Sequence, residues 1–338
     1  MTLFSISMNV SRKFPQSRLR RTRFTSPIRS LVAENSLSVD DLIQPIFVKE
    51  DLDGIESIDS LPGINRYGLN ALDKEIEKIQ NNKIKAVAIF PVINPEKKDD
   101  QGSESLNEDN LVCTAIKQIK KNSELAVIAD VALDPYTSHG HDGVLDENGY
   151  VENDKSLSLL IEQALTLAKA GADMIAPSDM MDGRIAGIRE SLESNDFANT
   201  IILSYAAKYS SKFYGPFRDA VGSSTNLGAG SKDTYQMSVA NIEEALHEVK
   251  MDIEEGADIV MVKPGMPYLD VVKAVKDTFK VPTFAYQVSG EYAMLKAAIE
   301  NGWLAEEVLE ESLLSFKRAG ADCVLTYAAN EIAIKLNQ

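Results

Sequence analysis

Eight short apolar runs alternate with longer amphipathic stretches along most of this 338-residue chain. The runs are rich in Val, Ile and Ala and show little polar alternation, which is typical of strands buried on both faces of a parallel sheet. They lie at residues 42–48, 86–93, 125–131, 173–177, 200–205, 258–263, 283–288 and 322–327. Between them, the segments 157–170, 239–255 and 305–319 have the apolar spacing of helices. This alternation predicts an α/β fold.

The tripeptide Gly-Ala-Asp occurs three times, beginning at Gly171, Gly256 and Gly320, each time between a helical pattern and an apolar run. Glycine is favoured just past a helix end, where the backbone turns left-handed. We therefore interpret each tripeptide as a helix-to-strand junction. Eight strand–helix units predict a closed (β/α)8 TIM barrel. A doubly wound open sheet is the main competitor, but it usually carries a Gly-rich phosphate loop of the GxGxxG or GxxxxGK[ST] type, and the sequence has neither.

Charge and composition narrow the classes of partner. The net charge of −16 disfavours nucleic acid, and the absence of any apolar stretch of 18 residues predicts no membrane span. The first 30 residues nevertheless hold seven Arg and Lys residues, from Arg12 to Arg29, and no acid. This segment is expected to be an arm, residues 1–35, that docks on an acidic neighbouring subunit of a cytoplasmic enzyme; the alternative is a transit peptide for an organelle such as a plastid. Residues 36–338 are expected to form the catalytic barrel.

Polar residues concentrate at the carboxyl ends of the apolar runs, where barrel enzymes place their active sites. Lys263 ends an otherwise apolar run, so burial should lower its pKa and favour the neutral, nucleophilic amine. Lys208 follows the neighbouring run by three residues, and two amines close together lower each other's pKa. The pair predicts a Schiff-base site. Taken singly, Lys263 could instead be a rim lysine paired with a carboxylate, and Lys208 a solvated loop lysine.

The stretches around these lysines resemble the porphobilinogen synthase family, also called 5-aminolevulinate dehydratase. The matching segments are residues 135–141, 176–184, 204–208, 213–220, 261–268 and 288–291. They occur in order between about residue 40 and the end of the chain. The resemblance implies a barrel with an N-terminal arm, assembled as a homo-oligomer, usually an octamer. It implies a lyase of tetrapyrrole (heme and chlorophyll) biosynthesis that condenses two 5-aminolevulinate molecules to porphobilinogen, loses two waters and uses no organic cofactor.

The resemblance also implies a role for individual residues. Lys263 matches the Schiff-base lysine of the P site, which binds the propionate-side substrate, and Lys208 matches that of the A site, for the acetate side. Residues implied to hold the two substrate carboxylates are Ser289 and Tyr327 at the P site, and Arg218, Lys232 and Gln236 at the A site. Strand-end residues expected to complete the substrate pocket are Asp130, Ser178, Asp179, Tyr205 and Tyr286. The segment 209–230, with Gly222, Gly228 and Gly230, resembles a lid.

The resemblance also bears on which metal ion the protein uses. Some family members bind catalytic zinc through three cysteines, at positions that read Ala132, Asp134 and Asp142 here. We therefore expect no catalytic zinc. The two aspartates are candidates for binding Mg²⁺ or a monovalent cation such as K⁺, or for orienting the second substrate's amino group. Glu248 matches the ligand of an allosteric Mg²⁺ at a subunit interface; the alternative is an ordinary solvated helix carboxylate.

Two other functions use the same features. A class I aldolase or lyase would place one Schiff-base lysine on a barrel and act on a different keto substrate. A catalytically inactive relative, retained for assembly or regulation, would keep the fold alone. The presence of both lysines together with the implied carboxylate-binding residues favours the synthase.

Overall fold

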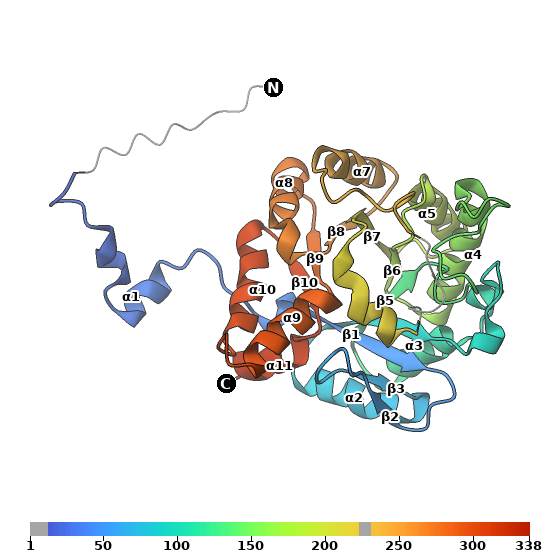
Figure 1. Cartoon of the computed structure of the whole chain (residues 1–338), viewed down its shortest axis with the longest axis horizontal. Coiled ribbons are helices and arrows are strands. Elements are labelled where there is room, and N and C mark those ends of the chain that lie inside the picture. The colour runs from blue at the N-terminus through green and yellow to red at the C-terminus, as the bar shows by residue number, and fades with distance from the viewer. Residues whose placement is uncertain (1–12, 223–230) are drawn as a thin grey trace. The chain divides into compact units, whose positions relative to one another are not determined.

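The computed structural model describes residues 13–222 and 231–338 (Figure 1). By its internal contacts the chain divides into two compact units, Met1–Ser36 and Leu37–Gln338. Within the described residues, no helix combines the length and the apolar character needed to cross a bilayer.

The larger unit is the (β/α)8 barrel that the apolar runs predict, with helices packed outside its strands (Figure 1). Its parallel strands are β1 (Leu42–Lys49), β4 (Ala86–Val92), β5 (Ala126–Val131), β6 (Met174–Pro177), β7 (Ile201–Lys208), β8 (Ile259–Lys263), β9 (Thr283–Gln287) and β10 (Cys323–Thr326). Neighbours in sequence pair in parallel around the sheet, and β10 closes it by pairing with β1 through Leu42 with Val324 and Ile43 with Leu325. All eight predicted strands are therefore confirmed.

The helices of this unit follow the strands in the expected alternation. They are α2 (Leu69–Asn81), α3 (Leu111–Asn122), α4 (Asn153–Ala170), α5 (Arg184–Ser194), α6 (Gly215–Ala220), α7 (Glu243–Glu254), α8 (Leu269–Phe279), α9 (Ser289–Glu300), α10 (Val308–Ala319) and α11 (Ala329–Leu336). One element was not predicted: an antiparallel hairpin of β2 (Ile55–Ser57) and β3 (Asn65–Tyr67) extends the sheet beside β1. Its strands have three residues each, too few for a readable periodicity.

The repeated Gly-Ala-Asp tripeptides form helix-to-strand junctions, as predicted. Their glycines are left-handed, with φ of +104° (Gly171), +110° (Gly256) and +111° (Gly320). Each aspartate accepts a hydrogen bond of 2.7–2.8 Å from a backbone N–H of the neighbouring strand. These bonds join Asp173 to Val127, Asp258 to Ile202 and Asp322 to Thr283. The motif thus both ends a helix and ties adjacent strands together at the face of the barrel opposite the expected active site.

The N-terminal unit has a 3-10 helix, η1 (Leu19–Arg23), and a short helix, α1 (Ser26–Leu31), within its described part. The Thr25 hydroxyl caps α1 by accepting a hydrogen bond from the Ile28 N–H at 3.4 Å. No residue of either helix is buried, and the apolar side chain of Leu31 is 84% exposed. Arg12, the first basic residue of the predicted arm, lies outside the described residues.

Candidate active site

The two predicted lysines lie opposite each other at the ends of adjacent strands. In the pairing of β7 with β8, Lys208 is the register partner of Lys263. The sequence places Lys208 in a loop after Tyr205, and that placement is wrong: β7 continues to Lys208, past an irregularity between Ser204 and Ala207. The strand continues because Ala207 and Lys208 resume the pairing with Val262 and Lys263 of β8. Both lysines therefore belong to strands of the barrel sheet.

Lys263 lies in an aromatic enclosure at the end of β8. Its Nζ lies over four rings, with centroids at 5.0 Å (Tyr205), 5.4 Å (Tyr214), 5.2 Å (Phe217) and 5.0 Å (Tyr286). Burial and, to a lesser extent, the charge of Lys208 together lower the pKa of Lys263 to about 7, against the opposing effect of nearby carboxylates such as Asp130. A large share of Lys263 is therefore the neutral amine near neutral pH, as attack on a ketone requires.

Lys208 contacts polar groups instead of aromatic rings. Its Nζ donates a hydrogen bond to the backbone carbonyl of Ser178 and lies 3.3 Å from Asp142 Oδ1. The Ser178 hydroxyl in turn donates to Asp130 Oδ2 at 3.1 Å. The strand-end residues Ser178 and Asp130 are thus brought together beside this amine.

A third lysine, Lys232, neutralises Asp134 and Asp142. Its Nζ lies 2.6 Å from Asp142 Oδ2 and 3.3 Å from Asp134 Oδ2. The Tyr235 hydroxyl adds a hydrogen bond of 2.9 Å to Asp142 Oδ2. Burial acts to raise the pKa of Asp142, but the ammonium groups of Lys208 and Lys232 outweigh it and hold that pKa well below its usual range. Asp142 is therefore an ionised carboxylate between two lysines.

Buried oxygens without a donor mark where a ligand could bond. Burial raises the pKa of Asp130 to about 6, although both Lys263 and Lys208 act to lower it. Within residues 13–222 and 231–338, no donor reaches Asp130 Oδ1 or Gln236 Oε1. Gln236 lines a hollow together with Lys208, Lys263, Arg218 and Lys232. The residues implied for the A-site carboxylate thus surround the same space as both lysines.

The two residues implied for the P-site carboxylate lie at the ends of the next strands. The Tyr327 hydroxyl, just past β10, is 2.8 Å from the Tyr286 hydroxyl of β9. Ser289 opens α9, and its hydroxyl accepts a hydrogen bond of 2.9 Å from the Phe217 N–H. Tyr286 and Phe217 also enclose Lys263. Tyr327 and Ser289 are therefore each hydrogen-bonded to a residue that borders this amine.

Asp179, which the sequence predicts in the pocket, is close enough to Lys208 for that charge to act on its pKa, and among the described residues its Oδ2 has no donor. Its Oδ1 accepts a hydrogen bond from the Met181 N–H and lies 3.7 Å from Arg184 Nε. Arg184 also pairs with Asp252 of α7 at 3.2 Å. The described contacts of Asp179 therefore belong to a buried ion-pair network with Arg184 and Asp252.

Glu248 lies on α7, away from the lysines. It is half-buried, and burial raises its pKa, with the charge of Arg184 acting in the opposite direction. Acidic neighbours Asp182, Asp233 and Glu244 line the same hollow. Among the described residues, no three His, Cys, Asp or Glu side chains converge as a preformed metal cage.

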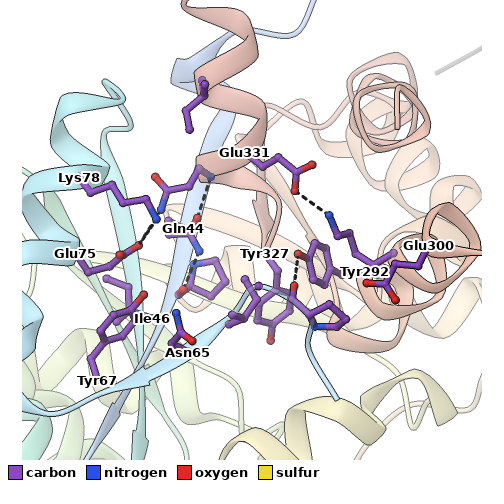
Figure 2. A pocket seen from close by; sticks show the side chains of 17 residues that line it. Gln44, Ile46, Asn65, Tyr67, Glu75, Lys78, Tyr292, Glu300, Tyr327 and Glu331 are labelled. Carbon is purple, nitrogen blue, oxygen red and sulfur yellow. Dashed lines mark hydrogen bonds and ion pairs between the residues drawn. The ribbon is translucent and has the colours of Figure 1, made fainter. Parts of the chain in front are cut away.

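A second cavity, of about 440 Å³, lies beside β1 and α11 (Figure 2). Its lysines are held in ion pairs, Lys78 with Glu75 at 3.5 Å and Lys296 with Glu331 at 3.2 Å. Neither faces a second amine in the way that Lys263 faces Lys208, so this cavity lacks the paired nucleophiles. It meets the candidate active site at Tyr327, which lines it (Figure 2).

The structure adds active-site residues that sequence reasoning missed. Tyr214 and Phe217 enclose Lys263, and Tyr235 fixes Asp142. The only available signal was their position within or beside stretches already singled out for neighbouring residues. The predicted lid is described up to Gly222 only; its later part, with Gly228 and Gly230, lies outside the described residues.

Comparison with known proteins gives one consistent result. The family profile described as "Delta-aminolevulinic acid dehydratase" matches residues 16–335. Proteins with that name from Bradyrhizobium diazoefficiens and Methanothermus sociabilis are 54% and 52% identical, covering 94% and 95% of this chain and 90% and 98% of their own lengths. A crystal structure of delta-aminolevulinic acid dehydratase (porphobilinogen synthase) from Toxoplasma gondii, in complex with the product porphobilinogen, is 48% identical with a TM-score of 0.93. It covers 95% of this chain and 91% of that one.

Proposed function

The chain belongs to the delta-aminolevulinic acid dehydratase family, and we propose that it joins two molecules of 5-aminolevulinate into porphobilinogen through imines on Lys263 and Lys208. The observation that carries the catalytic assignment is the register pairing of these two lysines, one of them with a pKa lowered to about 7. A single-lysine aldolase leaves the second amine and its carboxylate partners without a role.

Imine formation begins at the neutral amine. The Lys263 nitrogen attacks the ketone carbon of the P-site substrate, and the ketone oxygen leaves as water after accepting two protons. Asp130, whose pKa burial raises to about 6, is suited to exchange protons near neutral pH. The Lys208 nitrogen attacks the ketone carbon of the A-site substrate in the same way and forms the second imine. Each imine releases one water, which accounts for both waters lost in the reaction.

Two bond-forming steps then free both lysines. The carbon beside the A-site imine loses a proton and attacks the P-site iminium carbon, and elimination returns the Lys263 amine. The amino nitrogen of the P-site substrate attacks the A-site iminium carbon and displaces Lys208, and loss of the remaining ring proton yields the pyrrole. Holding both substrates covalently on adjacent strands removes most of the translational cost of a bimolecular reaction.

The chain's cationic and polar groups orient the substrates. We assign the A-site carboxylate to Arg218, Lys232 and Gln236, which line the hollow shared by both lysines. A guanidinium suits a carboxylate through paired hydrogen bonds, whereas Lys232 acts as a point charge. We assign the P-site carboxylate to Ser289 and Tyr327, which border the enclosure of Lys263.

We further propose that this enzyme works without a cysteine-bound zinc. Zinc sites of that kind need thiolates, whereas the oxygens of Asp134 and Asp142 are hard ligands that already pair with the Lys232 ammonium. The donor set does not fit zinc, and no step above depends on a metal. Mg²⁺ fits Glu248 better, as an activator held by one carboxylate and waters.

We also propose assembly as an octamer through the N-terminal arm, supported by its exposed apolar residues such as Phe24 and Leu31.

Product formation and trapping test the function together. The enzyme is incubated with 5-aminolevulinate, porphobilinogen is detected by its colour reaction with an aldehyde reagent, and a second sample is reduced with borohydride before peptide mass spectrometry. We expect product, and substrate adducts on Lys263 and Lys208. An adduct with a different keto acid, and no porphobilinogen, would instead identify the aldolase.

The pH dependence follows from the lowered pKa of Lys263. Below about pH 7 this amine is protonated and cannot attack, so kcat/KM should fall about tenfold for each pH unit on the acid side. Above this pH, kcat/KM should reach a plateau before any alkaline loss. Initial rates at low substrate concentration, between about pH 5 and about pH 9, give kcat/KM as a function of pH and show where it begins to fall on the acid side. An acid-limb midpoint near the ordinary lysine value would show that burial does not activate Lys263.

The metal assignment has its own test. We expect a zinc-specific chelator to leave the rate unchanged, EDTA to lower it, and Mg²⁺ to restore it. Glu248→Gln should abolish the response to Mg²⁺, while Glu254→Gln, on the same helix and 63% exposed, should retain it. Loss of activity with the zinc chelator would overturn the zinc-free assignment and leave the reaction intact.

A further inference from the structure

An arginine outside the active site binds the end of a helix that borders it. Arg66 lies on β3, in the hairpin beside β1. Its Nε donates a hydrogen bond of 2.6 Å to the Ala220 carbonyl, and its Nη2 donates one of 2.8 Å to the Asp219 carbonyl. Both carbonyls belong to the last turn of α6. The guanidinium, whose side chain is 14% exposed, therefore caps the carboxyl end of this helix.

The same hairpin reaches α6 at a second point and holds Arg66 in place. The Ser60 hydroxyl donates a hydrogen bond of 2.5 Å to the Asp219 carboxylate. Arg66 Nη1 lies 2.6 Å from Glu56 on β2, and Glu56 also pairs with Lys49 at 2.6 Å. The direct pair with Glu56 fixes the direction in which the fork of the guanidinium points.

Helix α6 needs such support because it has only six residues. A helix this short is unstable in isolation, since few internal hydrogen bonds offset the cost of its first turn. At its amino-terminal side, the Phe217 N–H bonds to Ser289. The two contacts, from Arg66 and Ser289, hold the helix from opposite ends.

The position of α6 matters because of the side chains it carries. The Phe217 ring packs against Phe90 and Phe47, with centroids 5.2 and 5.9 Å apart, and lies 5.2 Å from Lys263 Nζ. The next residue, Arg218, lines the hollow that contains both lysines. A displacement of α6 would therefore move the Phe217 ring away from Lys263. It would also shift Arg218, which we assign to a substrate carboxylate.

We propose that Arg66 is a positioning residue for the reaction, because its cap on α6 places Phe217 over Lys263 and Arg218 at the substrate hollow. The proposal deepens the proposed function and rests on it. Arg66 itself contacts neither lysine; it acts through the helix. Arginine is required because a lysine has no planar fork and can satisfy only one carbonyl well.

The test compares Arg66→Gln and Arg66→Lys with a control change at Lys49, the other cation that pairs with Glu56. We expect Arg66→Gln to raise KM and to lower kcat/KM by about 10- to 100-fold, the scale of a displaced binding group. Arg66→Lys should recover part of this loss. Lys49→Gln, on β1, removes the Lys49–Glu56 ion pair but leaves the Arg66–Glu56 pair and both bonds from Arg66 to α6, so it should stay close to wild type. Thermal melts identify any variant that loses activity by unfolding.

Two readouts do not depend on product formation. If the Phe217 ring moves away in Arg66→Gln, water reaches Lys263 and its amine is less desolvated. The pH midpoint for labelling this amine with a small acylating reagent should then rise above the value of about 7 expected for wild type. The Val221 amide, which bonds to Phe217 O at 3.0 Å, should exchange hydrogen faster. Unchanged KM, labelling midpoint and exchange in a folded Arg66→Gln would overturn the proposal. An inactive wild type would refute the proposed function instead, and labelling and exchange would still decide the role of Arg66.

Discussion

Replacing Lys263 by methionine should lower the rate of porphobilinogen formation by about 10⁴-fold or more, because the variant loses the nucleophile and the residual reaction depends on binding alone. Methionine keeps an unbranched side chain of similar length, so the aromatic enclosure stays filled. The fold should persist, since the ammonium of Lys263 makes no ion pair with a described carboxylate and its burial is costly. Steady-state rates, together with a thermal melt close to that of wild type, measure this effect.

Matched lysine variants make the result specific. Lys208→Met should also abolish product, but reduction with borohydride should still trap substrate on Lys263, and this would separate the P site from the A site. Lys296→Met removes a lysine of the second cavity, where it pairs with Glu331 (Figure 2), and should keep the rate within a few-fold of wild type. A Lys263→Met enzyme that still forms product at an appreciable rate, or a Lys296→Met enzyme that does not, would move the reaction away from the β7–β8 strand ends.

The parts of this site that the sequence predicts are those that local pattern controls. Buried parallel strands read as apolar runs, so the runs locate the barrel, and the barrel topology makes strands β7 and β8 neighbours. From that adjacency follows the approach of Lys208 and Lys263, even though the run was predicted to end before Lys208. The extra strand length depended on Ala206 and Ala207, and alanine does not distinguish a strand from a loop.

The contacts that position these lysines are not predictable in the same way, because they join segments far apart in the chain. Lys232 reaches Asp142 across 90 residues, and Arg66 reaches Ala220 across 154. Nothing in the local sequence of either partner indicates the other. The resemblance assigned Lys232 to a substrate carboxylate, and the structure adds that its ammonium neutralises two aspartates. Asp179 and Arg184 are only five residues apart, so their contact is local. Their network is still not predictable from the local sequence, because its third member, Asp252, comes from α7.

That buried network should produce the largest stability effect in the chain. Arg184 is 2% exposed, Asp252 is 3% and Asp179 is 0%, so Arg184→Met would leave two carboxylates in the interior without their cation. Breaking a buried ion pair from one side costs about 3–5 kcal/mol. We expect the free energy of unfolding to fall by about this amount, measured as a lower urea midpoint or melting temperature. The matched control is Arg189→Met on the same helix: its partner Asp258 is 50% exposed, so the cost should stay below about 2 kcal/mol.

The pH dependence of this loss separates unpaired charge from lost packing. Burial already raises the pKa of Asp179 to about 6 in spite of the opposing charge of Arg184, and removing that charge would raise it further. A carboxyl whose pKa is higher in the folded state than in the unfolded state binds its proton preferentially on folding, so it destabilises the fold most above the folded pKa and least near the unfolded one. Arg184→Met should therefore lose less stability at about pH 5 than at about pH 8. A loss that is equal at both values would mean that Arg184 contributes through packing and hydrogen bonds, and that its charge is not what the two aspartates require.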